Sequence, residues 1–272
     1  MTARDYVLDA NDQEVARLLA YAKREAEEVR HAARQAGLAA GGRVVDVGCG
    51  PLGATQVFAE IVGESGFVAG IDQTKEALAV ARRVLDSIGL QRVELVEADI
   101  HSLDRPEWDR SFDLAYCRLV LLHQETPEET LRRVGRLVRA GGYVIYQDIL
   151  DEPSFPRSEP DVLAAHRAWE LLFAVFARKR RSPAVARDHG FLCQRLGWEL
   201  VAQRGKFAVT SADDGLAVLS RLLAASERSL LEEGLVNGGE LASLKSALEE
   251  ARHRDFRYWF GPIAIETVAR VR

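Results

Sequence analysis

Hydrophobic positions in the first 150 residues alternate between two periods. Short apolar runs predict five strands, at Arg43–Val47, Phe67–Asp72, Val93–Val96, Phe112–Cys117 and Tyr143–Ile149. Amphipathic stretches between them predict three helices, at Ala54–Val62, Thr74–Ile88 and Thr126–Arg139. Strands that alternate with helices in this way predict βαβ units. We therefore expect an α/β fold with a parallel sheet covered on both faces.

A long amphipathic helix is predicted ahead of the first strand, over residues 11 to about 37. Its apolar side chains lie on one stripe, formed by Val15, Leu18, Leu19, Ala22, Ala26, Val29 and Ala33. Gly37, Gly41 and Gly42 then end the helix.

The helix at Thr126–Arg139 has clear start and stop signals. Thr126 is predicted as its N-cap, Pro127 as its first residue and Glu129 as the reciprocal carboxylate of a capping box. Gly141 and Gly142 stand where a left-handed residue closes many helices.

The pattern changes after Ile149. A loop rich in Pro and Ser is expected at Asp151–Pro160. Beyond it we expect helices at Asp161–Lys179, Pro183–Leu196, Ala212–Glu233 and Gly239–Arg254, a last strand near Ile263–Val271, and either a strand pair (Trp198–Gln203, Lys206–Thr210) or one bent strand. Aromatic residues cluster in this half; most belong to the core, and some are expected to line a pocket.

Composition narrows the class of protein. The 272 residues carry 36 Lys and Arg against 41 Asp and Glu, for a net charge of −5. This acidity argues against nucleic-acid binding through a broad basic face. No apolar run is long enough to cross a bilayer and the first residues lack a signal peptide, so a cytoplasmic protein without a membrane partner is expected. Cys49, Cys117 and Cys193 are too widely spaced to imply a disulfide framework or a zinc site.

A glycine-rich turn follows the first predicted strand. Gly48, Gly50 and Gly53 satisfy the pattern G-x-G-x-x-G between a strand and a helix. Small residues allow the chain to turn sharply and let a ligand approach the backbone. The glycines alone do not say which adenosine-bearing cofactor binds.

Three carboxylates follow successive predicted strands. Asp46 suits a ligand ammonium group, Asp72 is placed to accept hydrogen bonds from both ribose hydroxyls, and Asp99 suits an adenine amino group with Ile100 packed on the ring. Each carboxylate taken alone has an equally good interpretation as a helix cap or a solvated loop residue. Together, beside a glycine turn, they favour cofactor binding.

Five short segments resemble the motif series of class I S-adenosylmethionine-dependent methyltransferases. They are Asp-Val-Gly-Cys-Gly at 46–50, Ile-Asp at 71–72, Ala-Asp at 98–99, Ser-Phe-Asp-Leu at 111–114 and Arg-Ala-Gly-Gly at 139–142. The resemblance covers residues 40 to 150. The run at 117–123 resembles small-molecule methyltransferases that modify quinones, sterols and secondary metabolites. Residues 151–272 resemble nothing specific.

The resemblance implies a Rossmann-like, doubly wound sheet of seven strands, mostly parallel, with an antiparallel last strand. It implies that Asp46 and the Gly48–Gly50 backbone, including Cys49, hold the methionine part of S-adenosylmethionine. Asp72 with Gln73 would hold the ribose, and Asp99 with Ile100 the adenine. Pro51 departs from the family pattern and removes a backbone donor. A methionine carboxylate contact would then come from other groups, such as the backbone of Cys117 and Arg118.

These observations predict methyl transfer to a small, fairly apolar acceptor, driven mainly by positioning. His123 is the candidate general base for a hydroxyl acceptor, and its alternative interpretation is a structural histidine near the 122–126 turn. We expect the N-terminal segment, with Tyr6 ahead of the helix, to act as a lid.

Candidate acceptor-binding residues lie in and beyond the fifth predicted strand: Asp148, His166, Trp169 and Phe173. His166 is more simply interpreted as a core histidine. Asp148 has no second and third acidic neighbour at the spacing of metal-dependent methyltransferases, so no metal is expected. The basic run Arg178–Arg181 is expected to end a helix.

Two other functions compete with this prediction. A nicotinamide-dependent oxidoreductase would explain the glycine turn and Asp72, but not Asp46 or Asp99. A protein that binds S-adenosylmethionine without methylating would leave the same motifs. We expect one domain, with a lid (1–42), a cofactor-binding core (43–150) and a cap with the last strands (151–272), acting on a small molecule as a monomer or homodimer.

Overall fold

The computed structural model describes residues 12–150, 158–159, 162–207, 209–252 and 258–272. A seven-stranded sheet runs in the order β3-β2-β1-β4-β5-β10-β7. Its strands are β1 (Arg43–Val47), β2 (Phe67–Asp72), β3 (Glu94–Glu97), β4 (Phe112–Arg118), β5 (Val138–Leu150), β7 (Glu199–Lys206) and β10 (Ile263–Arg270). The first five pair in parallel, whereas β10 pairs antiparallel with both β5 and β7. The predicted Rossmann-like sheet with an antiparallel last strand is confirmed.

Two helical layers cover this sheet. One face packs against α1 (Asp12–Gln35), α2 (Thr55–Val62) and α3 (Lys75–Ser87), through a core that includes Phe58 and Tyr116. The other face packs against α4 (Pro127–Leu137) and α6 (His189–Arg195). Successive residues of each strand alternate between these two cores. For example, Leu114 and Tyr116 face the first core, while Ala115 and Cys117 face the second.

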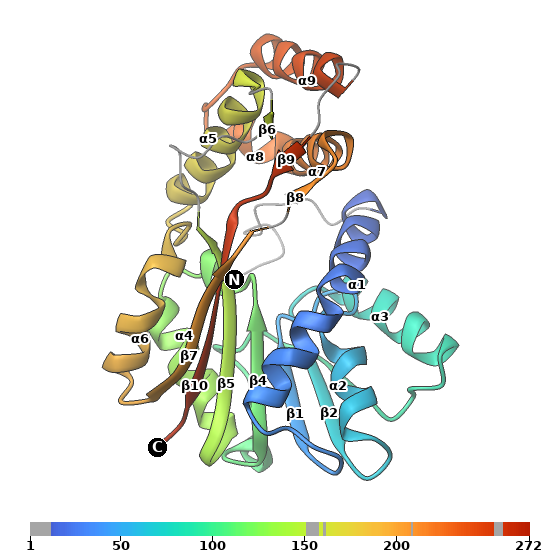
Figure 1. Cartoon of the computed structure of the whole chain (residues 1–272), viewed down its shortest axis with the longest axis vertical. Helices are drawn as coiled ribbons and strands as arrows, with labels where there is room; N and C mark the ends of the chain where they lie inside the picture. Colours follow the sequence, from blue (N-terminus) through green and yellow to red (C-terminus); the bar gives the residue numbers. More distant parts are fainter. Residues whose placement is uncertain (1–11, 151–157, 160–161, 208, 253–257) are drawn as a thin grey trace.

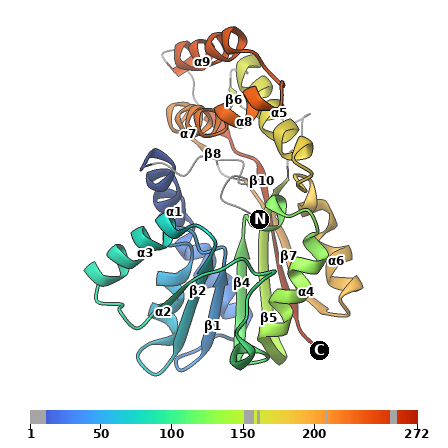
Figure 2. The same cartoon turned by 180° about the vertical axis from the view of Figure 1, so that it is seen from behind.

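A cap lies beyond the carboxyl ends of the parallel strands, at the top of Figures 1 and 2. It contains α5 (Leu163–Arg178), α7 (Ala212–Ala225), α8 (Glu227–Glu232), α9 (Gly238–Arg252) and a small sheet, in the order β6-β9-β8, of β6 (Ser158–Glu159), β9 (Tyr258–Phe260) and β8 (Val209–Thr210). The single helix predicted at Ala212–Glu233 breaks into α7 and α8 at Ser226. Strand β8 lies within the strand predicted at Lys206–Thr210, whereas β6 and β9, only two and three residues long, were not predicted.

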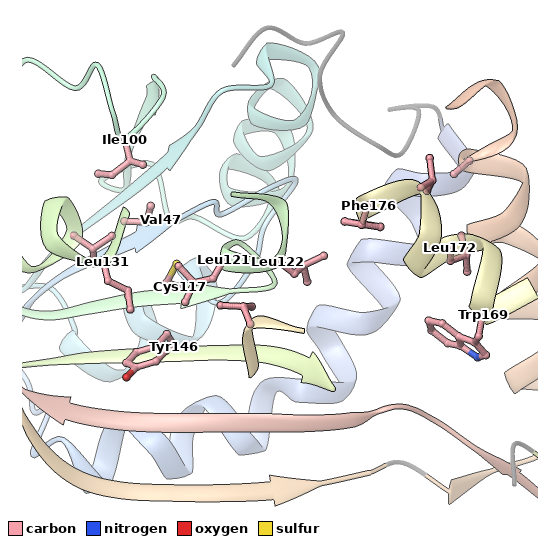
Figure 3. Packing of buried hydrophobic residues seen from close by; sticks show 14 of the residues in the cluster. Val47, Ile100, Cys117, Leu121, Leu122, Leu131, Tyr146, Trp169, Leu172 and Phe176 are labelled. Carbon is pink, nitrogen blue, oxygen red and sulfur yellow. The ribbon is translucent and has the colours of Figure 1, made fainter. Parts of the chain in front are cut away.

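One apolar cluster joins the sheet to the cap. Cys117 and Tyr146 on the strands belong to the same buried cluster as Trp169, Leu172 and Phe176 on α5 (Figure 3). The short turn η3 (Leu121–His123) lies between them, with Leu121 and Leu122 in the cluster. The cap is therefore held by core packing as well as by the chain connections.

The start and stop signals of α4 act differently from the prediction. The Thr126 side chain makes no capping hydrogen bond, and Glu129 instead forms ion pairs with Arg132 and Arg133. Gly141 does adopt a positive φ of 78°, but it lies inside β5, where the pairing with β4 shifts register. Helix α4 ends earlier, at Leu137, and passes directly into β5. The predicted start is confirmed, with Thr126 at the N-cap and Pro127 as the first helical residue, whereas the capping box at Glu129 and the glycine stop were wrong.

Two more predicted elements are shorter or divided. The helix predicted at Pro183–Leu196 consists of η4 (Val185–Asp188) followed by α6. A further short turn, η2 (Pro106–Trp108), precedes β4.

No helix within the described ranges has both the length and the apolar character that crossing a bilayer would demand.

Candidate functional site

A cavity of about 560 Å³ lies between the carboxyl ends of the strands, α1 and the cap. Nine of the residues singled out in the sequence line it: Asp46, Gly48, Cys49, Gly50, Asp72, Arg118, His123, Trp169 and Phe173. These residues come from four separate stretches of the chain, and the fold brings them together around one cavity. Tyr6 lies outside the described residues.

Asp46 forms the floor of the cavity at the end of β1. The carboxylate is only 2% exposed, and its Oδ2 accepts hydrogen bonds from the backbone N–H of Ala54 (2.9 Å) and the hydroxyl of Thr55 (2.8 Å) at the start of α2. Burial raises the pKa of Asp46 to about 6, against the opposing effect of these bonds. A buried carboxylate of this kind is poised to receive a cation.

The three glycines of the turn have different surroundings: two pack closely against other protein atoms, and one faces open space. A Cβ at Gly48 would lie 2.3 Å from Cγ2 of Val120, and one at Gly53 would lie 2.8 Å from Oδ2 of Asp46. At Gly50 a Cβ would meet nothing within 4 Å. All three glycines have a positive φ. Gly48 and Gly53 therefore permit close packing, while Gly50 presents bare backbone to the cavity.

Asp72 closes β2 and ties the strand to the glycine turn. Its Oδ2 accepts from the backbone N–H of Gly50 and its Oδ1 from the backbone N–H of Thr74, both at 2.8 Å. Burial raises the pKa of Asp72, although these hydrogen bonds favour its ionised form. The carboxylate also borders the cavity, where a ligand hydroxyl would meet it.

Four of the residues expected to bind the cofactor are absent from the described lining of this cavity. Asp99 follows β3 and accepts from the backbone N–H of His101 (3.0 Å), and Ile100 is buried in the core. Cys117 is fully buried under the sheet end, and Gln73 is half-buried beside Asp72. The described lining thus includes Asp46 and Asp72, but not the expected adenine contacts Asp99 and Ile100.

His123 stands where the polar floor meets the apolar part of the cavity. It ends the turn η3, is 9% exposed, and its ring centroid lies 5.0 Å from that of Phe176 on α5. The ring therefore faces the same space as both Asp46 and the cap.

The cap side of the cavity is aromatic and aliphatic. Trp169 and Phe173 on α5 have ring centroids 6.0 Å apart. Across from them α7 approaches β9 so closely that a Cβ at Gly215 would lie 1.9 Å from Cγ of Trp259. The sequence analysis did not single out Gly215, although it is the one glycine in the segment that forms α7. The remaining apolar lining includes Leu172, Phe176, Val218, Leu219 and Leu222.

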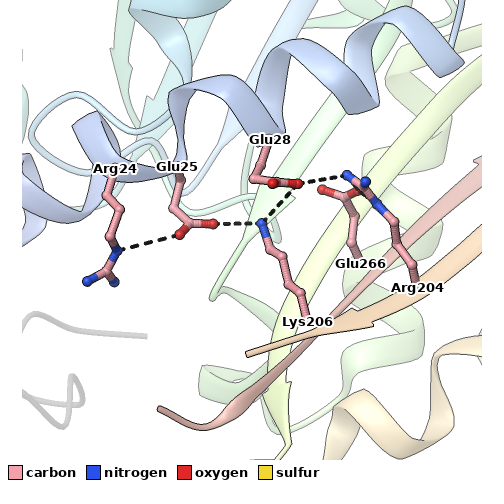
Figure 4. Close-up of polar contacts among 6 residues, drawn as sticks. All are labelled: Arg24, Glu25, Glu28, Arg204, Lys206 and Glu266. Carbon is pink, nitrogen blue, oxygen red and sulfur yellow. Dashed lines mark hydrogen bonds and ion pairs between the residues drawn. The ribbon is translucent and has the colours of Figure 1, made fainter. Parts of the chain in front are cut away.

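Ion pairs between α1 and β7 close one side of the cavity (Figure 4). Lys206 lies 2.8 Å from Glu25 and 3.5 Å from Glu28. Arg204 bridges Glu28 (3.1 Å) and the 1%-exposed Glu266 (2.8 Å). These contacts have no local signal in the sequence, because glutamates such as Glu25 and Glu28 on an amphipathic helix usually face solvent.

Asp148 and His166, the other candidate acceptor-binding residues, are absent from the described lining of the cavity. Side chains alternate along β5, so Tyr146 and Asp148 point into the layer under α6. Asp148 is fully buried there and lies off the cavity wall, which its neighbour Ile149 reaches instead. His166 is half-buried on α5 and also lies off the described lining. Its helical neighbours Trp169 and Phe173 turn toward the cavity.

Metal-ligating side chains are dispersed in the described ranges. No group of three His, Cys, Asp or Glu residues there is arranged to hold a metal ion. The three cysteines are buried and unbonded to one another.

Comparison with known proteins places residues 38–177, just over half of the chain, in a family described as "Methyltransferase domain". A demethylmenaquinone methyltransferase of Bacillus cereus is 31% identical over 133 residues, which are 49% of this chain and 52% of that protein. A ubiquinone biosynthesis O-methyltransferase of Azoarcus sp. is 34% identical over 111 residues, 40% of this chain and 45% of that protein. The matched region thus spans about half the length of these relatives.

A solved structure extends the likeness in fold to most of the chain. A putative methyltransferase from Bacillus halodurans superposes with a TM-score of 0.61 at 18% sequence identity, and covers 90% of this chain and 98% of that one. The sheet order and the matched family agree with the motif series in residues 46–142. The chain therefore belongs to the family of S-adenosylmethionine-dependent methyltransferase domains.

Proposed function

We propose that this protein transfers a methyl group from S-adenosylmethionine to a small, largely apolar acceptor. One observation carries the proposal: a single cavity has an acidic, glycine-walled floor and an aromatic cap side. The floor suits a charged sulfur nucleoside, and the cap side suits a hydrophobic ring or chain.

The residues of the floor fit S-adenosylmethionine. Asp46 would hold the ammonium group of its methionine part, and the open backbone at Gly50 would lie against the ligand. Asp72 would accept from the ribose hydroxyls. Arg118, which also lines the cavity, would oppose the methionine carboxylate. The roles of Gln73, Asp99 and Ile100 toward ribose and adenine stay predictions from the sequence.

S-adenosylmethionine, when bound, supplies a methyl carbon that is already electrophilic. The protein's part is then to hold the acceptor atom in line with that carbon and to exclude water, which accounts for about 7–11 kcal/mol of barrier reduction in well-oriented systems. Leu122, Phe173 and Phe176 would shield this space. His123 would take the proton of a hydroxyl acceptor, an effect typically worth about 10²–10⁴-fold in rate.

The acceptor we infer is aromatic and uncharged, such as a hydroquinone. Flat rings suit the surface formed by Trp169, Phe173 and Trp259. Lys206 on the cavity wall is already paired with Glu25 and Glu28, so it offers an anionic acceptor little attraction. Two relatives named for menaquinone and ubiquinone biosynthesis point to the same class.

The test has two stages. Calorimetry with S-adenosylmethionine, S-adenosylhomocysteine and NAD should show binding of the first two and none of the third. Radiolabelled S-adenosylmethionine is then offered to a panel of naphthohydroquinones, catechols, amines and carboxylates. Transfer to the hydroxyl-bearing rings supports the proposal. Tight binding of the nucleoside with no transfer to any acceptor would favour a binding protein, and NAD binding would favour an oxidoreductase.

Other parts of the sequence-based picture remain proposals. The segment 1–42 would serve as a lid, since α1 contributes Arg24, Glu25 and Glu28 to the cavity wall. The segments 43–150 and 151–272 would be the core and the cap of the same domain. The cytoplasmic location and the choice between monomer and homodimer stay predictions.

A further inference from the structure

A chain of polar side chains runs beneath the sheet, from the exposed Gln203 on β7 to buried groups beside the turn η3. Gln203 Nε2 donates to Thr267 Oγ1 at 3.1 Å, and Thr267 Oγ1 lies 3.2 Å from Nδ1 of His189. On the other side of the ring, Nε2 of His189 lies 3.4 Å from Oδ2 of Asp148. His189 and Asp148 are both fully buried. None of these four residues lines the cavity.

We assign the imidazole proton of His189 to Nε2, because Asp148 is the acidic neighbour of that nitrogen. In this tautomer Nδ1 accepts from the hydroxyl of Thr267, whose oxygen accepts in turn from Gln203. The Nε2–H then faces the carboxylate of Asp148. Both atoms are buried, and within the described residues neither forms a hydrogen bond of ordinary geometry. The 3.4 Å approach of Nε2 to Oδ2 is therefore the polar contact available to each of them.

The other oxygen of Asp148 holds the turn that carries His123. Its Oδ1 accepts from the backbone N–H of Leu122 at 3.0 Å. The carbonyl of Leu122 in turn accepts from the backbone N–H of Ser182 at 3.1 Å. Both backbone groups of Leu122 are thus fixed, and the next residue is His123, whose ring faces the cavity.

We infer that Asp148 and His189 are positioning residues, which set the turn η3 and thereby hold the His123 ring at the junction of cofactor floor and acceptor wall. The catalytic role of His123 in this inference rests on the proposed function, whereas the geometry of the turn does not. A buried carboxylate–imidazole pair contributes little net stability compared with an apolar pair of similar volume, so the fold alone does not require it. The orientation of a side chain used in catalysis does require such a supporting pair.

Backbone amide exchange and imidazole titration, followed by NMR in the ligand-free protein, test this directly. His189→Leu removes the donor to Asp148, whereas His189→Gln keeps an N–H near the position of Nε2. We expect His189→Leu to speed exchange of the Leu122 amide roughly tenfold or more and to shift the titration of His123. His189→Gln should restore both toward the wild-type values. The ¹⁵N shifts of His189 in the wild type should show the proton on Nε2.

Leu85→Ala is the matched control, because Leu85 is fully buried in the core on the opposite face of the sheet. It should lower stability without a selective effect on the Leu122 amide. Equal acceleration in Leu85→Ala and His189→Leu, or an unchanged Leu122 amide and His123 titration in His189→Leu, would overturn the inference. If His189→Leu does not fold, Asp148→Asn, which keeps the shape and removes the charge, is measured in the same way. None of these readouts needs an acceptor, so failure of the proposed function would be seen separately, in the transfer assay.

Discussion

The carboxylate of Asp72 accepts a 2.8 Å hydrogen bond from the backbone N–H of Gly50, and so joins the end of β2 to the turn after β1. The same carboxylate is the proposed ribose contact. Asp72 therefore has two roles that a substitution separates only in part.

Asp72→Ala should weaken binding of S-adenosylhomocysteine by at least tenfold, because one charged hydrogen bond is worth about 1.5–3 kcal/mol. Asp72→Asn keeps an acceptor oxygen and should lose less. Calorimetry measures both, with circular dichroism to confirm the fold. An unchanged dissociation constant in Asp72→Ala would refute the ribose assignment.

Asp46 should make ligand binding depend on pH. Its pKa is raised to about 6 by burial, so below pH 6 the free protein carries a neutral carboxyl there. An ammonium group favours the ionised form, and binding therefore releases a proton in this range. Affinity for S-adenosylhomocysteine should rise between pH 5 and pH 7 and then level off. Calorimetry in buffers of different ionisation enthalpy detects the released proton, and Asp46→Asn should remove both effects.

The same carboxyl should affect the stability of the ligand-free fold in the opposite sense. The native state holds this proton more tightly than the unfolded chain, so the free energy of unfolding falls as pH rises from 3.8 to about 6. At about 1.4 kcal/mol per pH unit the whole effect is about 3 kcal/mol. Urea titrations at pH 5 and pH 8 should show Asp46→Asn gaining stability over wild type at the higher pH. No gain at pH 8 would contradict the buried-carboxyl account.

His123→Ala should lower turnover on a hydroxyl acceptor by about 10²-fold or more, with nearly unchanged binding of S-adenosylhomocysteine. The reason is that the ring lies at the junction of the cavity and outside the floor where the nucleoside is held. His166→Ala is the matched control, since His166 stands on α5 but off the described lining. Full activity of His123→Ala across the pH range would make His123 a structural residue.

The two cations of β7 should differ in their effect on stability. Arg204 pairs with the buried Glu266, and Arg204→Met would leave that carboxylate without its partner, at a cost of about 3–5 kcal/mol. Lys206 pairs with Glu25 and Glu28 of α1 at the edge of the cavity, so Lys206→Met should cost no more than about 1 kcal/mol. Urea denaturation measures both. The double variant Arg204→Met with Glu266→Gln should recover most of the loss; equal costs for the two single variants would contradict this account.

Gly215→Ala should change the acceptor site while leaving the cofactor floor intact. A Cβ there would overlap Trp259, so the indole must move along the cap side of the cavity. We expect a raised KM for the acceptor with little change in affinity for S-adenosylhomocysteine. Gly238→Ala serves as a control, because a Cβ at Gly238 on α9 meets nothing within 4 Å. An acceptor KM equal to that of wild type would show that Trp259 does not contact the acceptor.

Sequence patterns were most informative where local and tertiary signals agree. The strands Arg43–Val47 and Phe67–Asp72 are apolar runs bounded by turn residues, and they occur in the structure as predicted. The wall formed by Asp46, Gly48, Gly50 and Asp72 was predictable because parallel strands bring their carboxyl ends to one edge.

Other features depend on partners that are distant along the chain. Glu129 was predicted as a capping residue, but its carboxylate forms ion pairs with Arg132 and Arg133, one turn away on the same helix. Asp148 lies on the predicted strand. The face of the sheet to which its side chain points depends on the pleat of β5 and on its partner His189, 41 residues later in the chain. Lys206 and Glu25, 181 residues apart, have no shared local signal.

The floor of the cavity and part of its cap side come from different parts of the chain. The glycine turn lies inside the matched region 38–177, with Trp169 and Phe173 of the cap side, whereas Gly215 and Trp259 lie beyond it. A lineage that retains the first part can therefore exchange the second and acquire a new substrate, without rebuilding its handling of the methyl donor. A chimaera that carries residues 209–262 from another member would be the laboratory version of that step.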